Sequence, residues 1–126
     1  MRVVDSSAWI EWFRDSPSGA LLAPHWPRRA DTIVPTLVQY ELAKWAAREV
    51  SDDLADQMIA YTETCRVVAL DTRIALRAAE LARAHRLAMA DAIVYATALD
   101  QGGDCLTCDR HFEGLEHVVF IKKAHD

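Results

Sequence analysis

The sequence predicts an α/β fold in which helices cover both faces of a mainly parallel central sheet. Two observations support this. Short apolar runs, several of them rich in valine or isoleucine, alternate with longer stretches of helical periodicity along the chain. Strands separated by helices are joined by crossover connections, which produce parallel pairing and a sheet buried on both faces. With 126 residues and no repeat or linker-like run, we expect a single domain over residues 1–126.

The expected strands are short apolar runs bounded by polar residues. They are Arg2–Val4, Thr32–Val34, Arg66–Ala69, Asp104–Thr107 and Val118–Ile121. The expected helices place apolar residues three and four positions apart. They are Ser7–Arg14, Thr36–Val50, Asp52–Thr64, Thr72–His85 and Ala90–Asp100. A shorter helix is expected around Ser18–His25, where nearby prolines interrupt the pattern.

Composition limits the functional class. Hydrophobic residues make up 52% and charged residues 26%, as in an ordinary globular protein. Charged residues interrupt every apolar run near Met1, and no run approaches the roughly 20 residues of a membrane span, so we expect a cytoplasmic protein. The net charge of −5 argues against a protein that coats nucleic acid through its overall field. An enzyme with a local basic patch remains compatible with that charge.

Three cysteines, an odd number, argue against a disulfide framework. Cys105 and Cys108 form a C-x-x-C with His111 shortly after them, but a zinc site would need a second pair or better-placed histidines. We therefore interpret these two as buried thiols on a strand.

Two carboxylates lie where apolar residues are expected. Glu41 falls inside the apolar stripe of the helix 36–50, which consists of Leu37, Val38, Leu42 and Trp45. Asp91 heads a row of the helix 90–100 that continues with Val94, Tyr95, Ala98 and Leu99. A carboxylate on an apolar face is costly to bury unless it is paired or binds a metal. The alternative for Asp91 is that it caps its helix.

Two further carboxylates lie at strand ends. Asp5 directly follows Val3 and Val4, and Asp109 directly follows the strand 104–107 and Cys108. In an α/β fold, ligands bind beyond the carboxyl ends of the strands. The alternative is that both are polar turn residues, with Asp5 capping the next helix.

Carboxylates that converge on one point repel one another unless a cation neutralises them. Oxygen ligands select hard cations, so Mg²⁺ or Mn²⁺ is the expected occupant. Such a metal supports hydrolysis of a phosphodiester by a bound water. The chain contains no Gly-rich phosphate loop, G-x-S-x-G or H-E-x-x-H motif that would indicate another enzyme class.

Four segments resemble the PIN domain, and within it the VapC-like toxins of toxin–antitoxin pairs. They are V-V-D-S-S-A-W-I at 3–10, Tyr40-Glu41-Leu42, A-D-A-I-V-Y-A-T-A at 90–98 and L-T-C-D-R-H-F at 106–112. The resemblance covers essentially the whole chain, in order. One departure is Ala88-Met89, where many relatives have Pro or Ser before the A-D-A block.

The resemblance implies a three-layer α/β/α sandwich and a Mg²⁺- or Mn²⁺-dependent endoribonuclease. It also implies a VapB-like antitoxin that blocks the site, and commonly a homodimer. The family's acids correspond to Asp5, Glu41, Asp91 and Asp109. Its small hydroxyl residues correspond to Ser7 and Thr107, which we expect to orient carboxylates and water. A non-catalytic module that binds RNA or a partner, and a DNA-directed nuclease of the same chemistry, are the alternatives.

Three other features are open to two interpretations. Arg110 and His111 adjoin Asp109 and are candidates for substrate contact, although His111 could instead pack beside Phe112. A basic helix face is either an RNA-backbone surface or, as we favour, an ordinary solvated face; it comprises Arg73, Arg77, Arg83, His85 and Arg86. Large rings crowd the first helix and either pack in the core or form an exposed partner surface; they are Trp9, Trp12 and Phe13.

Overall fold

Five parallel strands form the central sheet of the computed structural model, which describes residues 1–124. The strands are β1 (Arg2–Val4), β2 (Thr32–Pro35), β3 (Arg66–Val68), β4 (Asp104–Thr107) and β5 (Val118–Phe120). Their order across the sheet is β3-β2-β1-β4-β5, and every neighbouring pair is parallel. The predicted parallel sheet is confirmed, and β1 lies at its centre.

The predicted helices form with ends that differ from the expected ones by one residue at most. They are α1 (Ser6–Phe13), α3 (Thr36–Glu49), α4 (Asp52–Glu63), α5 (Thr72–His85) and α6 (Met89–Asp100). The helix expected around Ser18–His25 divides into α2 (Pro17–Leu22) and a 3₁₀ turn at Ala23–His25. Two further 3₁₀ turns, Arg29–Asp31 and Arg110–Phe112, were not predicted because one turn is too short to show a period.

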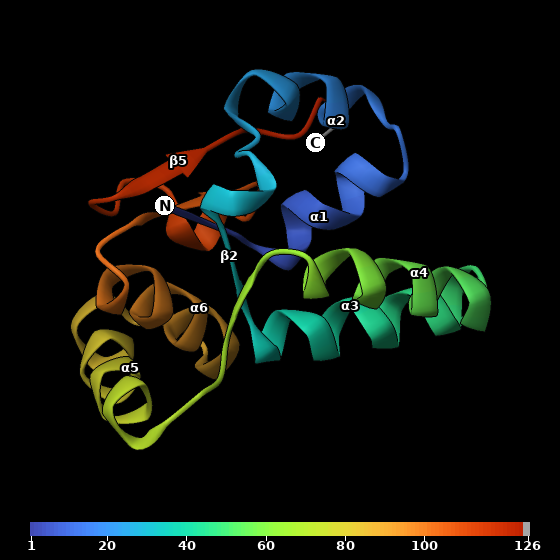
Figure 1. Cartoon of the computed structure of the whole chain (residues 1–126). Coiled ribbons are helices and arrows are strands. Elements are labelled where there is room, and N and C mark those ends of the chain that lie inside the picture. The colour runs from blue at the N-terminus through green and yellow to red at the C-terminus, as the bar shows by residue number, and fades with distance from the viewer. Residues whose placement is uncertain (125–126) are drawn as a thin grey trace.

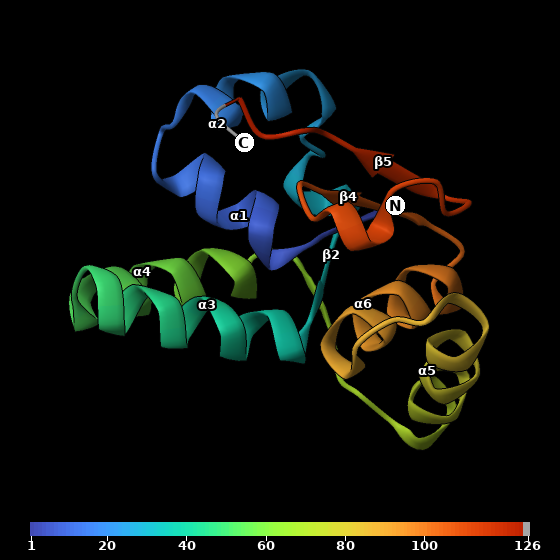
Figure 2. The same ribbon diagram turned by 180° about the vertical axis from the view of Figure 1, so that it is seen from behind.

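Helices lie on both sides of the sheet, as in a three-layer α/β/α sandwich. Figure 1 shows α1 and α2 on one side and α5 and α6 on the other, and Figure 2 shows the same arrangement from behind. The α3–α4 pair extends outward from the end of the sheet at which β2 stops. Helix α6 contacts β1, β2 and β4, and it is buried on most of its surface. It is therefore the central helix of its layer.

The chain order creates a switch point beside β1. After β1 the chain builds β2 and β3 on one side, and it later adds β4 and β5 on the other side. The connections that leave the carboxyl ends of β1 and β4 therefore diverge, which opens a crevice there in α/β folds. This is the end of the sheet at which Asp5 and Asp109 follow their strands.

Contacts at the amino-terminal ends of the strands fix the register of β1 and β4. Arg2 is paired with Asp104 across the two strands, and its Nε and Nη2 donate to Asp104 Oδ1 and Oδ2 at 2.7 and 2.9 Å. A Cβ on Gly103 would lie 2.5 Å from the Met1 carbonyl oxygen, so the close approach of the two segments requires glycine. The register in turn fixes the spacing of the residues that follow both strands.

The aromatic residues of α1 pack mainly against one another and their neighbours. Trp9 is completely buried, and Trp12 and Phe13 are half-buried. Trp12 stacks on Trp26 at a centroid distance of 4.3 Å, and Trp9 meets Tyr61 edge-on at 5.7 Å. Core packing therefore accounts for most of the ring surface, and only the outer edges of Trp12 and Phe13 face solvent.

The cysteines of the C-x-x-C pair are buried, with Cys105 in β4 and Cys108 directly after it. Burial raises the pKa of the Cys105 thiol well above its ordinary value, which keeps it protonated. Among residues 1–124, no helix combines the length and apolar character needed to cross a membrane.

Candidate active site

The four predicted carboxylates line one pocket at the switch point of the sheet. The pocket has a volume of about 410 Å³, and its walls include Asp5, Glu41, Asp91 and Asp109. They come from four segments that are distant in sequence: the end of β1, the middle of α3, the first turn of α6 and the residues after β4. The fold therefore brings together the four acids that were predicted from sequence.

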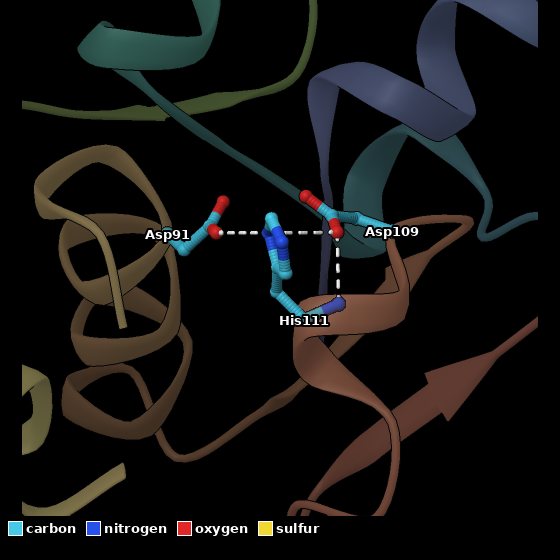
Figure 3. A group of neighbouring side chains, drawn as sticks. All are labelled: Asp91, Asp109 and His111. Atoms are coloured by element: carbon cyan, nitrogen blue, oxygen red, sulfur yellow. Dashed lines mark hydrogen bonds and ion pairs between the residues drawn. The ribbon is translucent and has the colours of Figure 1, made fainter. Parts of the chain in front are cut away.

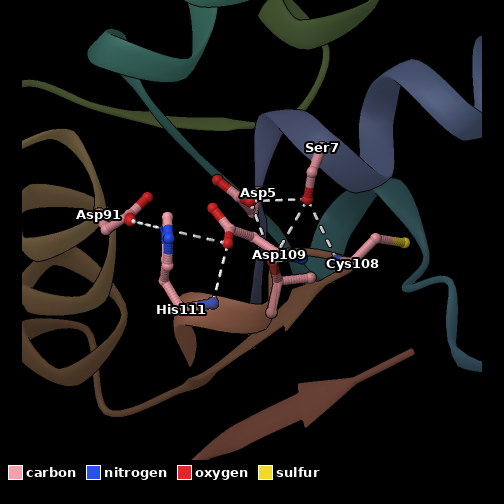
Figure 4. Close-up of polar contacts among 7 residues, drawn as sticks. Asp5, Ser7, Asp91, Cys108, Asp109 and His111 are labelled. Carbon is pink, nitrogen blue, oxygen red and sulfur yellow. Dashed lines mark hydrogen bonds and ion pairs between the residues drawn. The ribbon is translucent and has the colours of Figure 1, made fainter. Parts of the chain in front are cut away.

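Asp5 is the most buried of these acids. Its carboxylate Oδ2 accepts a hydrogen bond from Ser7 Oγ at 2.7 Å (Figure 4) and another from Thr107 Oγ1 at 2.9 Å. Asp5 occupies the N-cap position of α1, but its side chain makes no capping hydrogen bond. Burial raises the pKa of Asp5, the two hydroxyls oppose that rise, and the charge of Asp109 adds to it. The carboxylate is thus oriented by neighbouring hydroxyls and is not used as a helix cap.

The same hydroxyls bind the backbone that follows β4. Ser7 Oγ accepts the Cys108 N–H at 3.1 Å, and Thr107 Oγ1 accepts the Asp109 N–H at 2.9 Å. Each hydroxyl therefore donates to the Asp5 carboxylate and accepts a backbone N–H from the segment that follows β4. This arrangement fixes Asp109 relative to Asp5.

Asp91 and Asp109 face each other across the pocket, with the His111 ring between them (Figure 3). His111 Nδ1 lies 3.2 Å from Asp91 Oδ2 and 3.2 Å from Asp109 Oδ1. The Asp91 side chain is 15% exposed, that of Asp109 29% and that of His111 72%. Ala88 is the N-cap of α6. Asp91 is therefore not the cap of its helix, and its carboxylate faces the pocket.

Glu41 projects from the edge of the buried face of α3. The fully buried row of this helix is Val38, Leu42 and Ala46, and the neighbouring half-buried row is Leu37, Glu41 and Trp45. Ser6 Oγ donates to Glu41 Oε1 at 3.1 Å. The apolar stripe predicted from sequence merges these two rows, so Glu41 lies at its border and its carboxylate reaches the pocket.

Negative charge is concentrated in the pocket. Burial raises the pKa of Glu41, and the charge of Asp5 raises it further. Burial also raises the pKa of Asp91, as does the charge of Asp109, while the hydrogen bond from His111 lowers it. Carboxylates with mutually raised pKa values favour either protons or a cation beside them. Electrostatically, the pocket is therefore suited to a cation.

The available ligand atoms suit a hard divalent metal. Asp91, Asp109 and His111 each offer one ligand atom, and these three atoms all lie within 4.8 Å of one another. Mg²⁺ and Mn²⁺ prefer carboxylate oxygens and keep several waters, so a few protein ligands at one side of an open pocket are sufficient. The residues present therefore fit such an ion.

The other predicted residues lie near the pocket or away from it. Arg110 is exposed and lines a neighbouring cavity of about 500 Å³ that also borders Ser7 and Asp109. The basic residues of α5 are exposed, and Arg73 pairs with Asp100 on α6 at 2.8 Å. Both interpretations of this helix face require exposed side chains, so the choice of an ordinary solvated surface stays a prediction.

Sequence reasoning missed several residues of the pocket. Ser6, which binds Glu41, belongs to the D-S-S run that drew attention to Ser7, so its hydroxyl could have been found. Arg14 pairs with Glu11 at 3.3 Å, and both line the pocket. Lys123 lines it as well, but no motif in the sequence points to this lysine.

Comparisons with known proteins identify the same fold. The sequence model of the PIN domain matches residues 2–118. A chain of a toxin–antitoxin complex from Klebsiella pneumoniae is 19% identical, with a TM-score of 0.82, over 98% of this chain and 99% of that one. VapC20 from Mycobacterium tuberculosis, described as a sarcin–ricin loop cleaving toxin, is 17% identical, with a TM-score of 0.75, over 94% and 97% of the two chains.

A third similar structure is FitAcB from Neisseria gonorrhoeae, which is 19% identical, with a TM-score of 0.76, over 95% of this chain and 96% of that one. A search of the curated proteins finds no match to this sequence. The family match and the similar structures confirm the expected resemblance to the PIN domain and its VapC-like members.

Proposed function

The chain belongs to the PIN domain family, and we propose that it is a Mg²⁺- or Mn²⁺-dependent endoribonuclease that acts as the toxin of a toxin–antitoxin pair. One observation carries the proposal: four carboxylates from four separate segments line a single pocket at the switch point of the sheet. Such a concentration of acids is destabilising unless it binds a cation. The cost of gathering these acids without a cation favours the proposal that the pocket binds one.

In this proposal Asp5, Asp91 and Asp109 would hold the cation, and Glu41 would contact it directly or through a water. When bound, the ion supplies a nucleophilic water at neutral pH and offsets the charge that develops on the phosphate. Ser7 and Thr107 hold the Asp5 carboxylate at 2.7 and 2.9 Å, which removes the cost of ordering it during the reaction.

RNA is the substrate that the comparisons favour. VapC20, at 17% identity, is described as cleaving the sarcin–ricin loop, and we extend a ribonuclease activity to this chain by that analogy. The pocket chemistry handles the phosphodiester of RNA or DNA alike, so the assay below includes both.

An antitoxin would inhibit the enzyme by occupying the acid pocket. Several carboxylates in one concavity attract an arginine or lysine, and a guanidinium pairs with carboxylates through two hydrogen bonds. We propose that a basic side chain from a flexible VapB-like segment enters the pocket, while an apolar part of that segment lies on α1 near the exposed edges of Trp12 and Phe13. A homodimer, which the family resemblance implies, belongs to the same proposal.

Cleavage of labelled single-stranded RNA by the purified chain, with single-stranded DNA of the same sequence in parallel, tests the nuclease assignment. We expect cleavage with Mn²⁺ or Mg²⁺, none with EDTA, and a loss of at least about 100-fold in Asp5→Asn, in line with removing a charged group from a preorganised site. Asp56→Asn is the matched control, because Asp56 is exposed on α4 and undergoes the same chemical change.

The outcomes separate the alternatives. Equal cleavage by Asp5→Asn and the wild type under matched metal would show that the acid pocket is not the active site. Cleavage of single-stranded DNA in preference to RNA would replace the ribonuclease assignment by a DNA-directed one. Binding of RNA with no cleavage in either metal would favour the non-catalytic module.

A further inference from the structure

The C-terminal segment crosses from β5 to α2 and is anchored on both sides of Lys123. Before Lys123, the Ile121 N–H donates to the Thr107 carbonyl oxygen at 2.9 Å. After it, the Ala124 N–H donates to Ser18 Oγ at 2.9 Å, and Ser18 is buried. Figures 1 and 2 both show this segment running from β5 toward α2. Lys123 is therefore held in place by the fold on a segment fixed at both ends.

Lys123 lies at the junction of two cavities. It lines the acid pocket, and it also lines the adjacent cavity of about 500 Å³ together with Ser7, Cys108, Asp109 and Arg110. Ser7, Asp109 and Lys123 are common to both cavities. The adjacent cavity therefore opens directly beside the acids, and it contributes two cationic side chains to their surroundings.

Lys123 brings positive charge to the edge of the acid pocket. Lys123 is half-buried, and it forms no ion pair with any residue in the described range 1–124. Its neighbour Lys122 is exposed and lines neither cavity. A half-buried ammonium without an ion-pair partner beside a reactive pocket is suited to an anionic group of the substrate.

We propose that the 500 Å³ cavity is a phosphate subsite, in which Lys123 binds a backbone phosphate adjacent to the one that is cleaved. The ligand is a single RNA strand, and the inference rests on the proposed nuclease function. A strand whose scissile phosphate lies among the acids must pass its next phosphates over the rim of that pocket. At this rim Lys123 supplies a positive charge, and Arg110 lines the same cavity.

The other role open to Lys123 is to neutralise the carboxylates without touching substrate. The two roles differ in their dependence on salt. A lysine that contacts a phosphate releases a counterion when the strand binds, so its loss lowers the slope of log K against log salt by about 0.7 for a single strand. If Lys123 only offset the charge of the acids, its loss would change the affinity but would lower the salt slope by less than the value for one phosphate contact.

The experiment measures binding of a 5′-fluorescein-labelled single-stranded oligouridylate by anisotropy over a range of NaCl concentrations, with a fixed concentration of Ca²⁺ in place of the catalytic metal, so that the acids stay neutralised while cleavage is suppressed. The full chain is compared with Lys123→Ala, Lys123→Arg and Lys122→Ala. Lys122→Ala removes the same charge one residue away and is the matched control. Thermal melts confirm that all variants are folded.

We expect Lys123→Ala to weaken binding about 5- to 10-fold and to lower the salt slope by about 0.7, whereas Lys122→Ala changes affinity less than about 2-fold. Lys123→Arg should retain most of the binding, because a cation remains. Equal effects of Lys123→Ala and Lys122→Ala, or an unchanged salt slope in Lys123→Ala, would overturn the subsite.

The cleavage assay separates this inference from the proposed function. If the wild type cleaves RNA, Lys123→Ala should raise KM with little change in kcat, as expected for a group that binds substrate and transition state alike. If the wild type binds RNA with the Lys123 dependence above and never cleaves it, the nuclease assignment fails and the subsite stands. If it cleaves RNA and Lys123→Ala binds normally, the subsite alone fails.

Discussion

Replacing Asp91 by asparagine should stabilise the metal-free protein and should abolish most of its stabilisation by metal. The ligand oxygens of Asp91 and Asp109 lie within 4.8 Å of each other. Two unit charges at that separation repel by about 3.5 kcal/mol at an effective dielectric constant of about 20, and by about 0.9 kcal/mol in water. Asparagine keeps the shape of the side chain and removes this repulsion.

The expected gain lies in the lower part of that range. The Asp91 and Asp109 side chains are 15% and 29% exposed, and His111 contacts both carboxylates, so solvent and the ring reduce the repulsion. We expect Asp91→Asn to raise the free energy of unfolding by about 1–2 kcal/mol in EDTA. For a chain of 126 residues, an unfolding entropy of about 2.1 cal/mol/K per residue converts this into a rise in Tm of about 4–8 °C.

Mn²⁺ should reverse the order of the two melting temperatures, so that the wild type melts above Asp91→Asn. At a Mn²⁺ concentration about 100-fold above its Kd, the wild type gains about 2.7 kcal/mol, or about 10 °C in Tm. Asp91→Asn gains little because it lacks a ligand. Thermal melts followed by circular dichroism, in EDTA and in Mn²⁺, measure both effects, with Asp56→Asn as the control. A variant that melts below the wild type in EDTA, or that gains as much from Mn²⁺, would refute the reasoning.

Four further predictions concern pH, the buried hydroxyl, toxicity and the antitoxin. The pKa of Asp91 is raised in the folded state, so ionisation of this carboxyl lowers the free energy of unfolding as pH rises from its ordinary pKa through the raised one. The greater stability of Asp91→Asn in EDTA should therefore vanish when the pH falls below the ordinary pKa. Thr107→Val removes one of the two hydroxyls that bind Asp5 and leaves the Asp109 N–H without its partner, so it should cost about 1–3 kcal/mol of stability, whereas Thr107→Ser should retain most of it in urea unfolding. Expression of the chain alone should arrest growth of a bacterial host, and Asp91→Ala, accumulating to the same level, should relieve it; equal growth of both strains would end the toxin proposal. Trp12→Ala should weaken binding of the cognate antitoxin in calorimetry, whereas replacing the antitoxin's basic residue should restore cleavage with binding largely kept.

The acids could be predicted because their signals are local. Asp5 and Asp109 each follow an apolar strand, and Asp91 interrupts a row of apolar residues on its helix. That they share one pocket depends on β1 and β4 being neighbours, which is a property of the strand order. The sequence does not reveal the strand order directly; the convergence was predictable from the rule that ligands bind at strand ends and from the resemblance to the PIN domain.

The remaining residues of the site depend on details of direction that a pattern does not carry. Ser6 and Ser7 are adjacent, yet about 100° of helical rotation directs one hydroxyl to Glu41 and the other to Asp5. The 3₁₀ turn Arg110–Phe112, which was not predicted, likewise directs the neighbouring side chains of His111 and Phe112 to different surroundings. Phe112 enters the core, whereas His111 is largely exposed and faces the acids, so packing beside Phe112 does not account for His111, and its contact with substrate stays a prediction.

Lys123 was missed for a different reason. Its position depends on a hydrogen bond between Ala124 and Ser18, which lie 106 residues apart in the chain. The segment after β5 has no helical or strand periodicity, so its path over the pocket is set by tertiary contacts alone.

The central claim is that the pocket formed by Asp5, Glu41, Asp91 and Asp109 binds one or more divalent cations. An anomalous difference map from crystals soaked in Mn²⁺, compared between the wild type and Asp91→Asn, tests it most directly. We predict a strong peak within bonding distance of Asp91 and Asp109 in the wild type, and its loss or marked weakening in the variant. A wild-type map with no peak in this pocket at saturating Mn²⁺, or an equal peak in Asp91→Asn, would contradict the claim.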